Sequence, residues 1–299
     1  MTGILPVKKP AGFTSFDVIG KLRGVTHTRK IGHSGTLDPM ATGVLPLFFG
    51  GATKCCDILP NEDKRYVANL RFGIVTDTQD TTGKVLEEKE SRVTKKEFCA
   101  VVSEFIGKQM QTPPMYSAVK INGRPLYDLA REGKVVERAQ KEIEVYSIEV
   151  LDFDEHAQTA KIEVSCGKGT FIRTLINDMG EKLGCGAAMS SLERTMAGGF
   201  DISECCTISD VEEMMKNGTF EEHLIPVERL FEDLPRLVLD DFDKRLYRSG
   251  VPLELQKRGW GGIEGNIAVF DESGMILGIS FMDEEANELR LRKMLNTDK

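Results

Sequence analysis

The chain has 299 residues, 40% hydrophobic and 29% charged, which is typical of a globular protein with room for about two domains. No apolar run approaches the ~20 residues of a membrane-spanning helix, and the N-terminus lacks a signal peptide's apolar core, so we expect a cytoplasmic protein. The seven cysteines show no C-x-x-C spacing, which favours reduced packing residues over a disulfide framework or a zinc site.

Charge is unevenly distributed along the chain. The formal net charge is -8, which argues mildly against a nucleic-acid-binding protein because such proteins are usually basic. Residues 1–54 nevertheless carry seven basic side chains against two acidic ones, a local net charge of +5. A basic face of this kind can hold phosphates even on an acidic protein.

Short strands and helices are predicted in the first hundred residues. Residues 3–7 predict a strand, and Ser15 predicts the N-cap of a helix that runs to about Leu22. Apolar and polar side chains alternate over residues 64–73, which indicates another strand. A capping box at 94–97 predicts the start of a second helix.

Residues 32–46 read Gly-His-Ser-Gly-Thr-Leu-Asp-Pro-Met-Ala-Thr-Gly-Val-Leu-Pro and contain one carboxylate, that of Asp38. The glycines permit close backbone approaches, and Pro39 directs Asp38 out of the α region. In one interpretation Asp38 caps a helix or closes an Asx-turn. In the other it is a nucleophile or base held on a rigid loop.

The segment from Gln111 to Lys134 interleaves aromatic and cationic side chains. Its two prolines force an extended entry, and Asn122-Gly123 is a strong turn signal. The segment predicts either a solvated loop and helix or a mobile insertion that grips RNA.

Residues 143–153 and 161–166 alternate as two strands, which predicts a hairpin. The second strand leads into a helix that ends at Gly184 and places Arg173 in its first turn. A cation there opposes the helix macrodipole unless an anion lies nearby, so we expect a partner carboxylate for Arg173. A later capping box, Ser209 with Glu212, predicts a short helix.

The last seventy residues differ in character. Leu234-Pro235 is typical of a hinge, and a helix is predicted over 240–248. Short strands are predicted at 267–270 and 275–281, joined by a turn. These elements indicate a small β-rich domain of about sixty residues.

Together these motifs resemble the TruB family of tRNA pseudouridine synthases. The matching blocks occur in the family's order at 5–15, 32–54, 64–83, 113–133 and 165–195. The resemblance implies an α/β (α+β) fold, with a mixed, largely antiparallel pseudouridine-synthase sheet flanked by helices. It further implies a catalytic domain over 1–232 with an RNA-gripping insertion at about 108–140, and a PUA-like RNA-binding domain over 233–299.

The activity implied by the resemblance is conversion of uridine 55 in the T-loop of tRNA to pseudouridine. Asp38 is then the nucleophile or base, and Arg173 keeps it ionised, since a nearby cation lowers a carboxyl pKa by roughly 1 to 3 units. Tyr66 stacks on the flipped base and is placed to handle the C5 proton. On the residues alone, a strand core residue with a hydrogen-bonded hydroxyl is a credible alternative for Tyr66.

Further substrate contacts follow from the same resemblance. His33 matches the histidine at the site vacated by the flipped base, although it could be a turn residue. Leu192 matches the apolar wall of the uracil pocket, and Phe171 stands where many relatives have Tyr. The remaining matches are contacts with RNA along the cleft: Lys54, Asp77, Lys120 and Lys9.

No cofactor motif is present, and no metal is implied, because the isomerisation needs neither electrons nor an energy source. The partner implied is the T-arm of tRNA, bound by a monomer without an obligate protein partner. Two alternatives stay open. The chain could mainly bind and refold tRNA, or it could hydrolyse a glycosidic bond with Asp38 and either Asp77 or Asp80.

Overall fold

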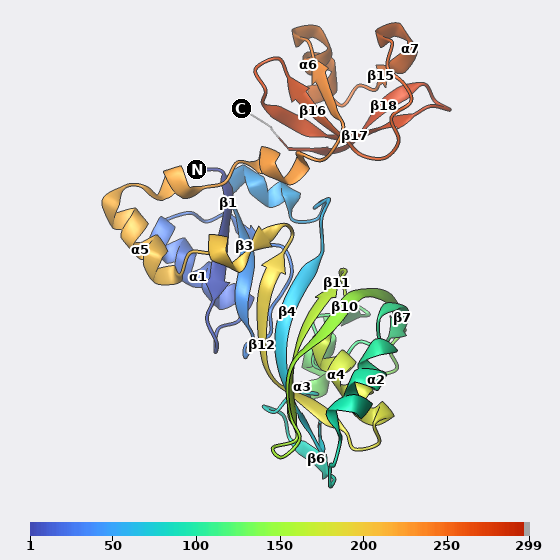
Figure 1. Cartoon of the computed structure of the whole chain (residues 1–299). Helices are drawn as coiled ribbons and strands as arrows, with labels where there is room; N and C mark the ends of the chain where they lie inside the picture. The colour runs from blue at the N-terminus through green and yellow to red at the C-terminus, as the bar shows by residue number, and fades with distance from the viewer. Residues whose placement is uncertain (296–299) are drawn as a thin grey trace.

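The computed structural model describes residues 1–295 and contains two main sheets (Figure 1). The larger sheet has the order β1-β3-β12-β4-β11-β10-β7, with β2 added beside β3 and β13 beside β12. Its pairs are antiparallel except that of β12 with β3, which is parallel. Its strands are β1 (Gly3–Lys9), β2 (Ile31–His33), β3 (Thr42–Phe49), β4 (Lys64–Phe72), β7 (Gly107–Gln111), β10 (Lys141–Asp154), β11 (Thr159–Cys166), β12 (Ala187–Ala197) and β13 (Phe200–Asp201).

Strand periodicity decides how this sheet packs. In β4 the side chains of Tyr66, Ala68, Leu70 and Phe72 are buried and their neighbours are not, as the alternation predicted. The predicted hairpin is also confirmed, because β10 and β11 pair antiparallel. One core lies where α2 and α4 cover the sheet, and another lies beneath α1 and α5 (Figure 1).

The remaining elements around this sheet are short. The helices are α1 (Ser15–Thr26), α2 (Lys95–Ser103), α3 (Leu126–Arg131), α4 (Ile172–Lys182) and α5 (Ile208–Asn217), with 3-10 turns η1 (Gly50–Cys55), η2 (Ile202–Glu204), η3 (Phe220–His223) and η4 (Val227–Phe231). Two small hairpins pair β5 (Ile74–Thr76) with β6 (Val85–Glu88) and β8 (Lys120–Ile121) with β9 (Arg124–Pro125). Asn122 and Gly123, both at positive φ, form the predicted turn between β8 and β9.

Two predicted helix starts are wrong by one or two residues. The N-cap of α1 is Thr14, which forms a capping box with Asp17, and the helix continues to Thr26. Ser15 is buried instead, and its hydroxyl accepts a 2.9 Å hydrogen bond from the Leu37 backbone N–H. Ser15 therefore joins the start of α1 to the loop that carries Asp38.

The start of α5 also differs from the prediction, because its capping box is Thr207 with Asp210. The predicted pair, Ser209 with Glu212, has the same spacing but lies inside the helix. Glu212 instead pairs with Lys21 at 2.8 Å. The ion pair therefore links α5 to α1, which it packs against.

The second sheet has the order β14-β16-β17-β18-β15 and follows the predicted hinge. The sequence predicted β16 and β17 and missed the other three strands. The elements are β14 (Arg236–Leu239), β15 (Leu253–Glu254), β16 (Ile267–Asp271), β17 (Ile276–Asp283) and β18 (Glu288–Met294), with α6 (Asp241–Arg248) and α7 (Leu255–Arg258) beside them. The fold class is thus as predicted, a mixed sheet flanked by helices with a β-rich C-terminal part.

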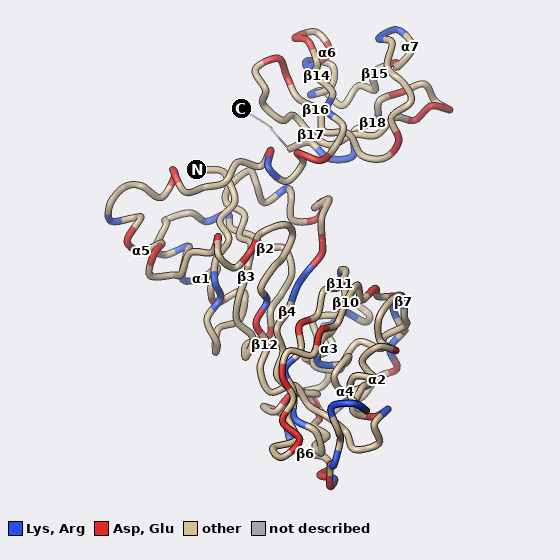
Figure 2. Tube along the Cα trace, viewed as in Figure 1, with Lys and Arg blue, Asp and Glu red and all other residues tan. Residues whose placement is uncertain are grey.

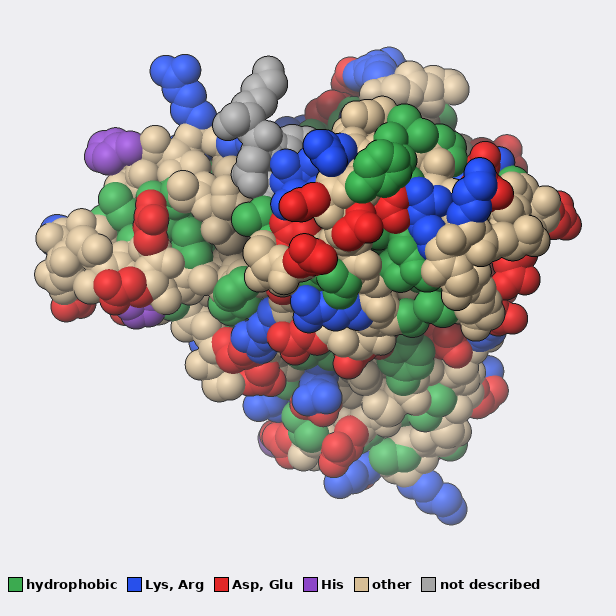
Figure 3. Space-filling model, turned by 90° about the horizontal axis from the view of Figure 1, so that it is seen from above, with side chains coloured by type: hydrophobic (Ala, Val, Ile, Leu, Met, Phe, Trp, Pro, Cys, Tyr) green, Lys and Arg blue, Asp and Glu red, His purple; other side chains and the backbone are tan. Residues whose placement is uncertain are grey.

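The two sheets are joined by an apolar cluster. Phe48 and Phe231 from the first part of the chain share this cluster with Phe270 and Ile279 of the second sheet. Acidic and basic residues are interspersed along the trace and on the face seen from above (Figures 2 and 3). Over residues 1–295, the structure contains no helix long and apolar enough to cross a membrane.

Candidate active site

The loop that carries Asp38 is held at both ends. It leaves β2 and enters β3, and its Leu37 N–H is bound by Ser15 as described above. At its far end Gly43 has a φ of 102°, and a Cβ there would lie 2.2 Å from the carbonyl oxygen of Arg194. Only glycine permits this approach of β3 to β12. The backbone therefore fixes where the Asp38 carboxylate can lie.

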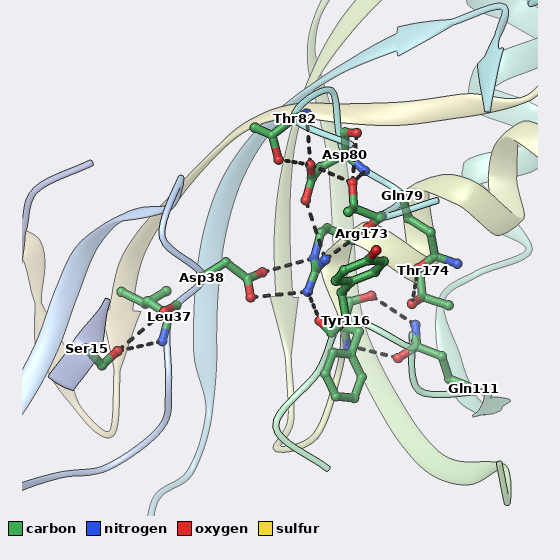
Figure 4. Close-up of polar contacts among 12 residues, drawn as sticks. Ser15, Leu37, Asp38, Gln79, Asp80, Thr82, Gln111, Tyr116, Arg173 and Thr174 are labelled. Atoms are coloured by element: carbon green, nitrogen blue, oxygen red, sulfur yellow. Dashed lines mark hydrogen bonds and ion pairs between the residues drawn. The ribbon is translucent and has the colours of Figure 1, made fainter. Parts of the chain in front are cut away.

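Arg173 makes a bidentate ion pair with Asp38 (Figure 4). Its Nε lies 3.0 Å from Oδ2 of Asp38, and its Nη2 lies 3.1 Å from Oδ1. Nη2 also donates to the Tyr116 carbonyl at 2.8 Å, and Nη1 donates to the Thr78 carbonyl at 2.9 Å. The carboxylate partner expected for the first turn of α4 is therefore present.

A second carboxylate, Asp80, lies on the other side of the same guanidinium (Figure 4). Its Oδ2 is 3.4 Å from Nη1 of Arg173, and its Oδ1 accepts hydrogen bonds from the Thr82 N–H at 2.9 Å and the Thr78 hydroxyl at 2.9 Å. From the sequence, Asp80 was predicted only as a possible carboxylate of a hydrolase. The density of Thr and Asp in residues 76–82 was the available signal, because such side chains close turns on one another.

The two partners of the ion pair differ in exposure. The Arg173 side chain is 6% exposed, whereas that of Asp38 is 35% exposed. Burial raises the pKa of the Asp38 carboxyl, while Arg173 acts in the opposite direction. Arg173 lowers the pKa of Asp38 as expected, but desolvation and the neighbouring carboxylate of Asp80 outweigh it, so the net pKa is raised.

The exposed side of Asp38 faces a cavity of about 420 Å³, which we call the Asp38 cavity. Four other predicted residues line it: Tyr66, Phe171, Arg173 and Leu192. Tyr66 and Leu192 are 6% and 7% exposed, so both side chains are almost completely covered by their neighbours. A larger hollow of about 580 Å³ lies between α2 and the end of α4 and contains none of the predicted site residues.

Burial raises the pKa of the Tyr66 phenol, although the cation of Arg194 acts in the opposite direction. The phenol is therefore neutral at physiological pH. Phe171 is the N-cap of α4, and its backbone is held by the Gln111 amide, which accepts from the Phe171 N–H at 2.9 Å and donates to its carbonyl at 3.1 Å. The predicted insertion contributes Ser117, Ala118 and Val119 to the cavity wall.

Lys9 does not contact solvent, and its predicted contact with RNA is incompatible with this burial. Its Nζ donates to the carbonyls of Pro10 at 2.9 Å and Pro39 at 3.2 Å, and to that of Phe13. Desolvation lowers the pKa of Lys9 to about 8, although Asp38 raises it. Lys9 therefore supports the loop that holds Asp38 from inside the protein.

The other predicted contacts lie outside the wall of the Asp38 cavity. His33 is next to the exposed ring of Phe16, with ring centroids 5.8 Å apart. Lys54 donates to the Leu295 carbonyl at 3.2 Å, where the chain leaves the second sheet. Asp77 accepts from the Tyr116 hydroxyl at 3.3 Å, and Lys120 is exposed in the small β8–β9 hairpin. Their contacts with RNA stay predictions.

Within the described chain, no group of three or more His, Cys, Asp or Glu side chains is arranged to hold a metal ion.

The fold resembles that of a Cbf5–Nop10–Gar1 complex, with a TM-score of 0.75 and 26% identity over 98% of this chain and 85% of that one. An H/ACA RNP bound to a substrate RNA containing 2'-deoxyuridine gives a TM-score of 0.73 at 24% identity over 99% and 85%. The fold is that of the pseudouridine synthases.

Comparisons of sequence are more specific. The TruB family pseudouridylate synthase N-terminal domain matches residues 23–172, and the tRNA pseudouridylate synthase B C-terminal domain matches residues 173–232. The tRNA pseudouridine synthase B of Clostridium tetani is 42% identical over 92% of this chain and 94% of its own length. That of Bacillus subtilis is 41% identical over 94% and 93%. The chain belongs to the TruB family of pseudouridylate synthases.

Proposed function

We propose that the protein isomerises uridine 55 in the T-loop of tRNA to pseudouridine, with Asp38 as nucleophile or base. The observation that carries this proposal is the bidentate Asp38–Arg173 pair at the edge of a cavity walled by Tyr66 and Leu192. The relatives named tRNA pseudouridine synthase B support the substrate. The family resemblance supports the position within the T-loop.

The reaction breaks the bond from C1′ to N1, turns the uracil and joins C1′ to C5. The proton that leaves C5 balances the one gained at N1, so the product is an isomer of the substrate. The carboxylate of Asp38 either attacks C1′ to form an ester or removes the C2′ proton to form a glycal. Both routes require an ionised carboxylate that is open to the cavity on one side and held on the other, as Asp38 is.

Arg173 fixes the rotamer of Asp38 through two contacts and is itself fixed by Asp80. Tyr66 stacks on the uracil, and its neutral phenol lies beside the C5 proton as the ring turns. Leu192 and Phe171 form the rest of the base pocket. The uridine must leave its stack to reach this pocket, at a cost of a few kcal/mol. His33 and the insertion at 108–140 stabilise the displaced loop.

Neither Asp77 nor Asp80 is among the residues that line the Asp38 cavity, which disfavours a two-carboxylate hydrolase. We assign residues 1–232 to the catalytic domain and 233–299 to a PUA-like RNA-binding domain, of which the last four residues lie outside the described chain. We further propose that the protein acts as a monomer and needs no cofactor.

The test is to incubate the protein with unmodified T-arm RNA, without metal or cofactor, and to map pseudouridine by carbodiimide-primer extension. We expect one modified site in the T-loop, and none with the Asp38→Asn variant. Release of free uracil would instead indicate a hydrolase, and binding without conversion would indicate an RNA-binding protein. Deuterium at C2′ separates the two routes, since it slows conversion when the C2′ proton is removed in a rate-limiting step.

A further inference from the structure

A second buried arginine, Arg194 of β12, has no counter-ion. Its side chain is fully buried, and its Nε donates to the Val44 carbonyl at 2.7 Å while its Nη2 donates to the Gly35 carbonyl at 3.1 Å. Its third nitrogen, Nη1, is buried and has no hydrogen-bond partner. Within residues 1–295 no carboxylate forms an ion pair with it. A buried cation and a buried N–H group without partners are both costly.

Lys64, the first residue of β4, brings a second cation to the same place. A Cβ added to Gly35 would lie 3.5 Å from Nη1 of Arg194 and 3.6 Å from Cε of Lys64, so the two side chains meet at this glycine. The Lys64 ammonium donates to the Glu62 carbonyl at 2.5 Å and forms no ion pair in the part of the chain that the structure describes. Burial lowers the pKa of Lys64, and Arg194 lowers it further.

Both cations line the Asp38 cavity. Arg194 is the register partner of Tyr66 across the β12–β4 pair, so the cations lie on the same wall as the proposed base pocket. A third lysine on the wall, Lys168, is already paired with Glu62 at 2.6 Å. Among the described residues that line the cavity, two carboxylates are already paired, Asp38 with Arg173 and Glu62 with Lys168, whereas Arg194 and Lys64 form no ion pair.

We propose that Arg194 and Lys64 form a phosphate subsite that binds a backbone phosphodiester of the nucleotide whose base enters the cavity. The inference rests on the proposed function and specifies how the flipped nucleotide is held. Uracil and ribose are neutral, so the phosphodiester is the one anionic group that the substrate brings. A guanidinium N–H and an ammonium together match the oxygens of a phosphate.

The subsite also has a positional consequence. Arg194 is bound to the Gly35 and Val44 carbonyls, which lie on either side of Asp38 in the chain. A phosphate on its free nitrogen is therefore fixed relative to the loop that carries the carboxylate. Holding the phosphate sets the register of the ribose, and so the approach of C1′ to Asp38.

The test uses T-arm RNA with one neutral methylphosphonate, placed either 5′ or 3′ of the target uridine. Binding by fluorescence anisotropy is compared for the wild type, Lys64→Met and Lys96→Met; Lys96 is an exposed lysine of α2, so its variant controls for loss of charge alone. We expect one of the two modified RNAs to bind the wild type about tenfold more weakly, and Lys64→Met to weaken binding of unmodified RNA by a similar factor.

The proposal is decided by measuring each variant with the modified RNA that binds the wild type more weakly. Replacing native RNA by the modified RNA that binds the wild type more weakly should reduce the affinity of Lys64→Met little or not at all. The same replacement should reduce the affinity of Lys96→Met by the full tenfold factor seen with the wild type. The salt slope of binding should also fall by about 0.7 to 0.9 in Lys64→Met. Arg194→Lys, which keeps the charge and removes the free N–H, should reproduce the loss where its melting temperature shows that it folds.

Two results would overturn the subsite. One is that the wild type binds both methylphosphonate RNAs as tightly as native RNA. The other is that Lys64→Met and the modified RNA each reduce the binding affinity by the same factor whether or not the other change is present. Conversion of uridine is measured in parallel. If uridine is converted but the effects of Lys64→Met and the methylphosphonate are independent, the subsite is wrong and the proposed function stands. If the two effects depend on each other but no uridine is converted, the proposed function is wrong and the phosphate subsite stands.

Discussion

Two buried arginines, Arg173 and Arg194, lie on the wall of one cavity and have opposite surroundings. Arg173 has a carboxylate on each side, and all three of its nitrogens make contacts. Arg194 lies beside the neutral Tyr66 phenol and donates to two backbone carbonyls, and its third nitrogen has no hydrogen-bond partner of good geometry. Identical side chains at similar depth thus differ in whether their charge is already neutralised.

Arg173 thus belongs to an ion pair that is already formed, whereas Arg194 is a cation that still lacks an anionic partner. The interactions of Arg173 are satisfied before any ligand arrives, so its effect is to orient Asp38. The interactions of Arg194 are complete only when an anion arrives. The comparison therefore predicts that replacing one arginine damages the chemistry and the fold, whereas replacing the other mainly damages binding.

The largest effects are expected for Arg173→Met. The substitution leaves Asp80 as a buried carboxylate without its cation, which we expect to lower the free energy of unfolding by about 3 to 5 kcal/mol. Arg194→Met, the matched variant, removes a charge that has no counter-ion and leaves two carbonyls unpaired, at about 1 to 3 kcal/mol. Urea unfolding measures both, and equal losses would contradict the comparison.

A smaller effect is expected for Asp80→Asn. The amide keeps the shape of the side chain but weakens its hold on Nη1 of Arg173, 3.4 Å away. Conversion of uridine should fall by about 10- to 100-fold, the range typical when a hydrogen-bond partner that orients a metal ligand is removed. The dissociation constant for RNA should stay unchanged, since Asp80 does not line the cavity. Weaker RNA binding with unchanged turnover would assign Asp80 to the RNA interface instead.

pH should affect the two ends of the cavity in opposite directions. Burial raises the pKa of Asp38, so its ionised form, and with it conversion, should be lost at a higher pH than for an ordinary aspartate. Burial lowers the pKa of Lys64, so RNA affinity should decline on the alkaline side before that of an ordinary lysine would. Turnover at saturating RNA, measured across pH, reports the acidic loss of conversion. Equilibrium RNA binding, measured across pH, reports the alkaline loss of affinity.

The raised pKa of Asp38 also affects the stability of the folded state. A carboxyl whose pKa is raised on folding favours the folded state below its unfolded pKa, and this contribution is lost as pH rises through the folded pKa. Asp38→Asn resembles the protonated form. The variant should therefore be more stable than the wild type at neutral pH, and the difference should shrink as the pH is lowered towards 4. A difference that grows on acidification would contradict the raised pKa.

Local patterns in the sequence predicted the elements with strong periodicity and the pairing of Arg173. Alternation is sufficient for β4 and for the β10–β11 hairpin, because one face of each is buried. That Arg173 has a carboxylate partner could be predicted because a cation in the first turn of a helix opposes the helix dipole, whereas its identity as Asp38 was implied by the family resemblance. Its second partner, Asp80, lies 93 residues away, so only the fold brings the two together.

Burial of long cationic side chains could not be predicted. Lys9 and Arg194 are both fully buried, yet their hydrogen-bond acceptors are mostly backbone carbonyls, which every residue possesses. No sequence pattern marks which carbonyls will be left free by the sheet. The predicted start of α5 was wrong for a similar reason. Two overlapping pairs at capping-box spacing occur around its first turn, and only the fold decides which of them caps the helix.

The smallest predicted effect tests that selection. Thr207→Ala removes a hydroxyl that accepts from the Asp210 N–H at 3.2 Å, and should lower the free energy of unfolding by about 1 kcal/mol. Ser209→Ala, two residues on and within the helix, removes no cap and replaces serine by a better helix former, so its effect should be close to zero. Thermal unfolding of the two variants side by side measures the difference. A larger loss for Ser209→Ala would move the start of α5 back to the position first predicted, and the ion pair of Glu212 with Lys21 would then need another explanation.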